Sequence, residues 1–520
     1  MSDEPDFRAR LGRFTVPPFV HDPAERHRKW GLPLDDETPG DYMVELNLSH
    51  EGGLEQASSL FLALYASIVP GNNLPLAISK SYYKVRLSAR ELRQLAAADD
   101  LHGDSRHRAI YKIWPDFPVQ ALIDRSAATV KADAAIRAFD ATGSGIVWAV
   151  IDSGIDAAHL HFGPGPDGTG KNRFCNTLFD STVARLHRDF TQEGVPDQCG
   201  AALDANIQSA LRDDFGHGTH VAGIIAGGLD SSGLDAPADF RVCERVFRPD
   251  PTGQSHTVRA EDRTVPAKSL RGVAPHCKLI SLKVLDRNGR GLTSGIMLAL
   301  RYIRENLNED PKLLRVHGVN LSLGYEFDAE LFACGQSPLC VEVDRLVKSG
   351  VVVVVAAGNT GYASIPTDAR YTKVAISNTI NDPGNASLAI TVGSSHRDSP
   401  HTYGVSFFSS KGPTADGRLK PDLVAPGERI TSATTPAQMT RLGLDNPPAA
   451  GNCYIDDSGT SMAAPHVSGA IAAFLSIRRE FIQRPEEVKK IFLDTATPLG
   501  RDRYFEGRGL VDLMRAIQSV

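Results

Sequence analysis

The sequence has few cysteines and no long apolar run. Its seven cysteines are scattered and include no C-x-x-C pair, which excludes a disulfide framework or a zinc ribbon as the basis of the fold. Cys334 and Cys340 could close a loop in an oxidising compartment, and we expect most of the others to be reduced thiols. The longest apolar run, residues 351–357, is far shorter than the roughly 20 residues that span a bilayer. We therefore expect no membrane-spanning segment and no membrane partner.

An excess of charge of either sign is also absent. The chain of 520 residues carries 56 Lys and Arg against 62 Asp and Glu, a net charge of −6. This small acidity predicts no nucleic-acid partner, because no basic excess is available to neutralise phosphates. The N-terminal stretch MSDEPDFRARLGRF lacks the apolar core of a secretory signal, so we expect a cytoplasmic protein and leave an unusual export pathway open.

Proline content and apolar periodicity divide the chain into three parts. Residues 1–40 contain several prolines and little periodicity, which predicts an extended N-terminal arm. Residues 41–125 combine alternating and helical apolar patterns with a capping-box pair, Ser88 and Glu91, and are predicted to form a small α+β domain. In residues 126–520, β-branched runs alternate with amphipathic stretches, which predicts a mostly parallel sheet flanked by helices. We expect strands at 146–151, 278–285, 318–323, 351–357 and 388–392, and helices beginning near His217, Thr293, Cys340, Ser461 and Pro485.

Three segments place a reactive side chain where a strand ends or a helix begins. Asp152 follows an apolar strand, the position of the usual crevice of an open α/β sheet. His217 opens a helix rich in small residues, and Ser461 stands between a glycine turn and an alanine-rich helix. The positive end of that helix dipole would suit a nucleophile that generates an oxyanion. Taken singly, Asp152 is better explained as a residue that caps the next turn, and the Ser461 segment does not decide between a nucleophile and an ordinary helix N-cap.

A metal site is the alternative interpretation of the histidines. His217 and His220 are three residues apart, whereas a helical zinc pair usually has four-residue spacing and an intervening glutamate. We therefore interpret His220 as a structural residue that supports the site from behind.

The three segments together resemble the subtilisin-like serine proteases, the subtilases of peptidase family S8. The motifs are VIDSGID around Asp152, HGTHVAG around His217 and GTSMAAPHVSG around Ser461. Further family-like segments lie between them in family order: RGVAPHCKLISLKVL, NLSLG, VVVVVAAGN and FSSKGPTADGRLKPDLVAPG. The resemblance covers roughly residues 130–520 and implies a three-layer α/β domain with serine endopeptidase activity.

The resemblance also implies roles for individual residues. Ser461 would attack the peptide carbonyl, His217 would take its proton, and Asp152 would orient the imidazole and stabilise the imidazolium. Asn359 would donate to the oxyanion together with the Ser461 backbone N–H. The substrate would bind as an extended strand against residues of two segments: Ser322, Leu323 and Gly324, and Ala356, Ala357 and Gly358. This chemistry requires no cofactor.

Two insertions depart from the compact family pattern, near residues 162–212 and 228–270. The second replaces the loop that holds a structural calcium in many relatives, so a calcium ion is conceivable here but has no assigned position. Scattered acids could supply hard oxygen ligands, although such acids are more often solvated. The candidates are Asp180, Asp189, Asp197, Asp204, Asp213 and Asp214.

The 41–125 unit resembles, in its order of elements, the propeptide domain of the family. This resemblance implies an intramolecular chaperone and inhibitor, and a zymogen cleaved between about Leu122 and Asp133. A permanently attached domain is the competing interpretation.

Two other functions stay open at this point. The first is a pseudoenzyme that holds a peptide without cutting it, against which the complete set of reactive residues argues. The second is an exopeptidase in which an insertion blocks one end of the groove.

Overall fold

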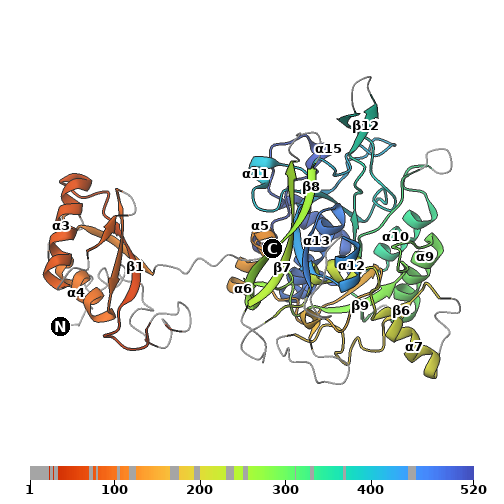
Figure 1. Cartoon of the computed structure of the whole chain (residues 1–520), viewed down its shortest axis with the longest axis horizontal. Coiled ribbons are helices and arrows are strands. Elements are labelled where there is room, and N and C mark those ends of the chain that lie inside the picture. Colours follow the sequence, from red (N-terminus) through yellow and green to blue (C-terminus); the bar gives the residue numbers. More distant parts are fainter. Residues whose placement is uncertain are drawn as a thin grey trace. The chain divides into compact units, whose positions relative to one another are not determined.

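The computed structural model divides the chain into two compact units, residues 1–120 and 121–520, which Figure 1 draws and which are described separately below. Helix α5 (Arg125–Thr129) belongs to the second unit, because Ala127 packs in its core. The sequence placed the boundary between residues 125 and 126. The structure describes Pro23, His27 and residues 33–69, 74–77, 80–101, 106–115, 125–163, 175–192, 199–229, 239–249, 256–310, 312–327, 333–366, 371–442 and 453–520.

The first unit is a small α+β fold. Its sheet has the order β2-β3-β1-β4, and every adjacent pair is antiparallel. Alternation along β1 buries Tyr42, Val44 and Leu46 against helix residues Phe61 and Tyr65. The elements are β1 (Gly40–Leu46), α3 (Gly53–Ile68), β2 (Leu76–Ala77), β3 (Tyr82–Leu87), α4 (Ala89–Asp100) and β4 (Ile110–Pro115).

The predicted capping box at the start of α4 is confirmed. The Glu91 backbone N–H donates to Ser88 Oγ at 3.2 Å, and the Ser88 backbone N–H donates to Glu91 Oε2 at 2.8 Å. Both donors would otherwise be unpaired at the helix N-terminus.

The second unit is built on a seven-stranded sheet in the order β15-β14-β11-β10-β5-β9-β6. All its adjacent strands are parallel. The strands are β5 (Val147–Asp152), β6 (Arg188–Asp189), β9 (Lys278–Lys283), β10 (Gly318–Leu321), β11 (Val352–Ala356), β14 (Ile390–Ser395) and β15 (Leu423–Pro426).

Helices cover both faces of this sheet (Figure 1). Helices α8 (His217–Ile225) and α13 (Thr460–Ile477) pack in one core, and α9 (Thr293–Arg301) and α10 (Pro338–Lys348) pack in the other. Val352 and Val354 join the core that contains α8 and α13, whereas Val353 and Val355 join the core that contains α9 and α10. A strand buried on both faces explains the uninterrupted valine run. The predicted three-layer α/β fold is confirmed. The helices are α6 (Ala132–Phe139), α7 (Gly200–Ala210), α8 (His217–Ile225), α9 (Thr293–Arg301), α10 (Pro338–Lys348), α11 (Pro400–Tyr403), α12 (Pro436–Arg441), α13 (Thr460–Ile477), α14 (Pro485–Asp494), α15 (Arg503–Glu506) and α16 (Leu513–Gln518).

Several strand ends differ from the sequence expectation: β9 ends at Lys283, two residues early, and β14 continues to Ser395. Two further differences have local reasons. Strand β10 stops at Leu321, because Ser322 and Leu323 leave the sheet and line a cavity. Strand β14 begins at Ile390, because the Leu388 backbone N–H donates to Asp344 Oδ1 at 2.9 Å.

The two predicted insertions contain regular structure. Residues 162–212 supply the edge strand β6 and helix α7. Residues 228–270 supply the antiparallel hairpin of β7 (Asp239–Pro249) and β8 (His256–Pro266). This hairpin extends a second sheet of order β16-β17-β7-β8, which also contains β16 (Ile430–Ala433) and β17 (Tyr454–Asp457). A separate hairpin pairs β12 (Tyr362–Pro366) with β13 (Tyr371–Ala375).

Helix α13 alone in the described part of the chain is long and apolar enough to cross a membrane. It is 83% buried within the structure, where it packs against α8 and β14. Its apolar composition is therefore accounted for by its place in the core of the second unit.

Candidate active site

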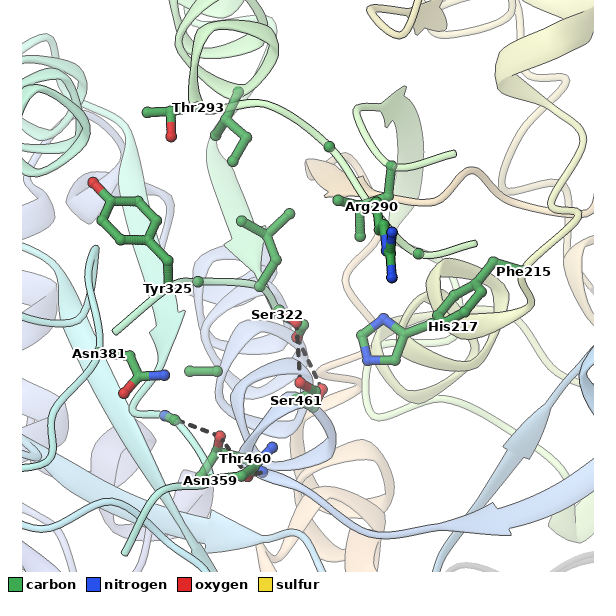
Figure 2. A pocket seen from close by; sticks show the side chains of 18 of the residues that line it. Phe215, His217, Arg290, Thr293, Ser322, Tyr325, Asn359, Asn381, Thr460 and Ser461 are labelled. Atoms are coloured by element: carbon green, nitrogen blue, oxygen red, sulfur yellow. Dashed lines mark hydrogen bonds between the residues drawn. The ribbon is translucent and has the colours of Figure 1, made fainter. Parts of the chain in front are cut away.

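A cavity of about 730 Å³ opens beyond the carboxyl ends of β9, β10 and β11, where α8 and α13 begin. It brings together residues far apart in the sequence, among them His217, Asn359 and Ser461, whose side chains point into it (Figure 2). The carboxyl ends of parallel strands form such crevices, because the strands converge there on loops and helix starts.

An acid and a histidine are paired beside this cavity. Asp152 is the last residue of β5 and His217 is the first residue of α8, and Asp152 Oδ1 lies 2.8 Å from His217 Nδ1. Asp152 is 1% exposed and His217 is 18% exposed. Burial acts to lower the pKa of His217, but the charge and hydrogen bond of Asp152 outweigh it and raise the pKa to about 9. The imidazole is therefore a stronger base than a solvated histidine.

Ser461 lies in the first turn of α13 and faces the same cavity. Its Oγ donates to the Ser322 carbonyl oxygen at 3.0 Å, and Ser322 Oγ donates to the Ser461 carbonyl oxygen at 2.8 Å (Figure 2). The described structure records no hydrogen bond from Ser461 to His217. In unliganded enzymes such catalytic contacts are often long and tighten when substrate binds.

Asn359 follows β11 and is held by the turn before Ser461. Its Oδ1 accepts hydrogen bonds from the Thr460 backbone N–H at 2.9 Å and from Thr460 Oγ1 at 3.1 Å. Because the oxygen of the amide is occupied, its Nδ2 is the group left to donate into the cavity. Gly358, at φ +109°, makes the turn after β11, and a Cβ there would lie 2.7 Å from Asn381 and 2.8 Å from Ser410.

Comparison with known proteins identifies the family to which this fold belongs. Residues 143–510 match the model of the subtilase family. The chain belongs to the subtilase family. Pyrolysin of Pyrococcus furiosus is 32% identical over 61% of this chain, although the match spans only 22% of pyrolysin. Serine protease AprX of Bacillus subtilis is 26% identical over 91% of this chain and 86% of its own length. Subtilisin E of Bacillus subtilis is 28% identical over 72% of this chain and 67% of its own length.

These similarities confirm the predicted recognition and the enzyme class that it implies, the subtilisin-like serine endopeptidases. The roles of individual residues in this subtilase are argued below as proposals.

The two predicted substrate-binding segments lie on walls of the cavity, with one correction. Ser322, Leu323 and Gly324 line it, as do Ala356 and Gly358. Ala357 does not. It is fully buried behind the wall, where its N–H donates to the Val392 carbonyl oxygen at 2.9 Å. Successive residues of an extended segment point to opposite sides, so one of three consecutive residues faces away.

Several lining residues were not singled out from the sequence. Most of them belong to the segment after β9, for which the sequence predicts only a helix that begins near Thr293. The available signal was their position after the carboxyl end of a buried parallel strand. These lining residues are Phe215, Leu285, Gly289, Arg290, Gly291, Thr293, Ile296 and Asn381.

Asp213 holds the start of α8 in this subtilase. Its buried carboxylate accepts five hydrogen bonds, from the hydroxyls of Ser153 and Thr219 and from the backbone N–H groups of Phe215, Gly216 and Thr219. Burial raises the pKa of Asp213, while these hydrogen bonds oppose the rise. The carboxylate thereby satisfies donors at the helix N-terminus that carries His217.

The described acids that were considered as calcium ligands each have a protein partner. Asp180 accepts from Thr182, Asp189 from Thr191, and Asp213 from the residues named above. Asp204 pairs with Arg185 and Asp214 with Arg212, and Asp197 lies outside the described residues. Within the described ranges no three His, Cys, Asp or Glu side chains are grouped so as to hold a metal ion. The described acids therefore do not fit a calcium site.

His220 and the cysteines do not belong to the residues that are candidates for catalysis. His220 is fully buried, with Nε2 3.2 Å from the Ile455 carbonyl oxygen. All seven cysteines are free thiols, so Cys334 and Cys340 do not form a disulfide in this structure.

The electrostatics of His217 predict an alkaline activity profile. The base must be neutral to accept a proton, and the pKa of His217 is raised to about 9, with Asp457 and Asp213 adding to the effect of Asp152. We expect kcat/KM to fall as pH drops below about 9. Replacing Asp457 by Asn removes a negative charge that favours the imidazolium, so it should move the acid limb to lower pH by about 0.3 to 1 unit.

The measurement is the pH dependence of kcat/KM at constant ionic strength. Asp494→Asn, which removes an exposed acid that does not line the cavity, is the matched control and should leave the limb unchanged. An acid limb that does not move in Asp457→Asn, or that moves equally in both variants, would contradict this account of the His217 environment.

Proposed function

We propose that this subtilase is a serine endopeptidase that hydrolyses peptide bonds through Asp152, His217 and Ser461 and an acyl-enzyme intermediate. The observation that carries the proposal is the 2.8 Å contact between Asp152 and His217 beside a cavity into which Ser461 also points. An oriented acid and base next to a hydroxyl on a helix start is the arrangement that activates a serine nucleophile.

The proposed reaction has two stages. Ser461 Oγ leaves the Ser322 carbonyl, attacks the substrate carbonyl carbon and gives its proton to His217. The imidazolium then protonates the leaving amine as the peptide C–N bond breaks and the acyl-enzyme forms. In the second stage a water molecule attacks the ester, again with His217 as base, and Ser461 recovers its proton. Asp152 stays ionised and stabilises the imidazolium throughout.

Charge on the former carbonyl oxygen is proposed to be stabilised by two donors. One is Asn359 Nδ2, whose amide is fixed through Oδ1 by Thr460. The other is the Ser461 backbone N–H at the N-terminus of α13, an 18-residue helix whose dipole favours negative charge at that end. Donors held in place before the reaction need no reorganisation when the charge develops.

Asn359→Ala should lower kcat far more than it raises KM, because Asn359 Nδ2 is proposed to interact with the oxyanion and not with the bound substrate. We expect a loss of about 10²- to 10³-fold in kcat, a magnitude borrowed from subtilisin. Steady-state kinetics on a blocked chromogenic peptide measures it. Asn288→Ala, an exposed asparagine that does not line the cavity, is the control. If Asn359→Ala raised KM and left kcat unchanged, the assignment of Asn359 to the oxyanion would be wrong.

The pseudoenzyme alternative predicts peptide binding without acylation. Labelling of Ser461 by a fluorophosphonate distinguishes the endopeptidase, which should be labelled, from the pseudoenzyme, which should not. The exopeptidase alternative predicts that free N-terminal peptides are cut and blocked ones are not. Comparing the two peptide forms with one sequence distinguishes the endopeptidase from this variant.

The first unit is proposed to act as the intramolecular chaperone and inhibitor of the second and to be removed by cleavage. Within the predicted interval, Ala127 and Val130 are core residues of the second unit, and the Leu513 N–H donates to the Val130 carbonyl oxygen at 3.1 Å. Cleavage beyond Arg125 would disrupt this packing, so we place it before Arg125. Intact mass and N-terminal sequencing of the wild type and Ser461→Ala test this, and a fully active enzyme that keeps residues 1–120 would exclude it.

A further inference from the structure

The described lining of the cavity contains one arginine, Arg290, and no carboxylate, and His217 is already paired with Asp152 behind the wall. Figure 2 shows the Arg290 side chain next to His217, with its guanidinium directed towards the imidazole. A bound peptide therefore meets a cation within the cavity that contains the reacting groups.

The guanidinium of Arg290 has no ion-pair partner in the part of the chain that the structure describes. The acid that precedes it in the same loop, Asp286, accepts from the backbone N–H groups of Asn288 and Arg290, at 2.8 and 2.9 Å, and the charge of Arg290 contributes to lowering the pKa of Asp286 without an ion pair between the side chains. Arg441 differs, because its guanidinium lies 3.8 Å from the ring centroid of Phe215 and donates to the Phe215 carbonyl oxygen. The N–H donors of Arg290 are therefore available to a ligand in the cavity.

The loop that presents Arg290 is constrained on both sides of the residue. Gly289 has φ +71°, and a Cβ there would lie 2.4 Å from the Phe215 ring. A Cβ on Gly291 would lie 2.2 Å from the Val284 carbonyl oxygen. Together with the Asp286 hydrogen bonds, these close approaches fix the backbone from which the guanidinium extends. A charge on a fixed backbone discriminates between ligands better than one on a mobile loop.

We propose that Arg290 is a specificity-determining residue that selects peptides with a glutamate or aspartate close to the scissile bond. The inference rests on the proposed function, since it names the substrate class of that same site. A guanidinium offers paired N–H donors that match a carboxylate. Because Arg290 is exposed at the cavity, we expect a preference of about five- to tenfold for Glu over Gln, weakened by salt.

The test uses a neutral blocked peptide in which one Glu, Gln or Lys is stepped through the positions around the scissile bond. Wild type, Arg290→Gln and Arg290→Glu are compared, with Arg287→Gln as the matched control. Arg287 is an exposed arginine of the same loop that does not line the cavity. The readout is kcat/KM at about 0.02 M and about 0.5 M salt, which differ several-fold in screening length.

We expect that the wild type prefers Glu to Gln at one or two positions of the peptide. Arg290→Gln should lose this preference and Arg287→Gln should keep it. Arg290→Glu should prefer Lys at the same positions. High salt should reduce the wild-type preference. No preference for Glu at any position in wild type, or a preference that persists in Arg290→Gln, would overturn the proposal.

A parallel measurement separates this proposal from the proposed function. The same peptides are titrated against the Ser461→Ala forms of each variant, with fluorescence anisotropy as the readout. Absence of Ser461-dependent turnover would refute the endopeptidase proposal. The anisotropy titrations would still decide the role of Arg290, because binding of the acidic peptide does not require the nucleophile.

Discussion

Ser461→Ala is expected to abolish peptide hydrolysis while leaving the protein folded. Removing the nucleophile should lower kcat by roughly 10⁶-fold, a magnitude borrowed from subtilisin. The structural cost is small, because the change removes one hydrogen bond, from Ser461 Oγ to the Ser322 carbonyl oxygen, worth about 1 kcal/mol. Alanine is also well suited to the first turn of a helix that contains several alanines.

Intact-mass spectrometry after treatment with a serine-reactive fluorophosphonate measures the result directly. The wild type should gain one adduct as the Ser461 oxygen replaces fluoride on phosphorus, and Ser461→Ala should gain none. Ser476→Ala is the matched control. It changes a serine of the same helix whose Oγ donates to the Ala473 carbonyl oxygen away from the cavity, and it should be labelled like the wild type.

Equal turnover by Ser461→Ala, with contaminating protease excluded, would refute the assignment of the nucleophile. An adduct on both proteins would place the reactive serine elsewhere in the chain. An adduct on neither would mean that the first unit covers the site or that the site is incompetent, and it would give the peptide-binding pseudoenzyme equal weight.

Asp422→Asn is expected to destabilise the second unit by about 3 to 5 kcal/mol, the cost of leaving a buried charge without its partner. Asp422 Oδ2 lies 2.6 Å from Lys420 Nζ, and Asp422 Oδ1 lies 3.2 Å from Lys489 Nζ. The Lys420 side chain is only 3% exposed. The ammonium group keeps two other acceptors, the Ala389 carbonyl oxygen and Thr391 Oγ1, but loses the only one of its three acceptors that carries a charge.

The pH dependence of this loss has a definite sign. Burial lowers the pKa of Lys420 to about 8 against the opposing charge of Asp422. In Asp422→Asn the pKa should fall further, so the folded variant binds fewer protons than the unfolded chain over a wider range. Its stability therefore starts to rise with pH already below pH 8, where Lys420 of the folded wild type is still protonated, so the deficit relative to wild type should shrink as the pH rises towards about 8 and stay constant above it.

Urea unfolding in the Ser461→Ala background, which prevents self-digestion, measures both effects. Glu487→Gln is the control, because it breaks an ion pair with Arg484 in which both side chains are more than half exposed, and it should cost less than about 1 kcal/mol. A loss in Asp422→Asn no larger than the control, or one that grows with pH, would contradict the role given to this pair.

Local patterns were sufficient for much of the fold. Strands at Val147–Asp152 and Val352–Ala356 and helices starting at His217, Thr293 and Pro485 lie within two residues of their predicted positions. Apolar runs and helix starts are properties of adjacent residues, so they can be recognised without knowing their neighbours in space. Exact strand ends are less well predicted, such as Leu321 in β10 and both ends of β14 (Ile390–Ser395), because they depend on contacts with distant residues.

For the candidate site, the sequence by itself determined which residues are proposed to carry the chemistry. Asp152, His217, Asn359 and Ser461 lie in distinctive motifs at strand ends and helix starts, where side-chain identity and backbone position are coupled. The family matched over residues 143–510 agrees with the recognition that those motifs allowed.

Only the tertiary structure decided how these groups are supported and what surrounds them. It showed Asp213 holding the start of α8, Ala357 facing away from the cavity, and Ser461 bonded to Ser322. It also placed Arg290 in the wall of a cavity that no described aspartate or glutamate lines. The physical reason is that these features depend on where side chains of irregular segments point, and that direction is set by packing between parts of the chain that no periodic pattern connects.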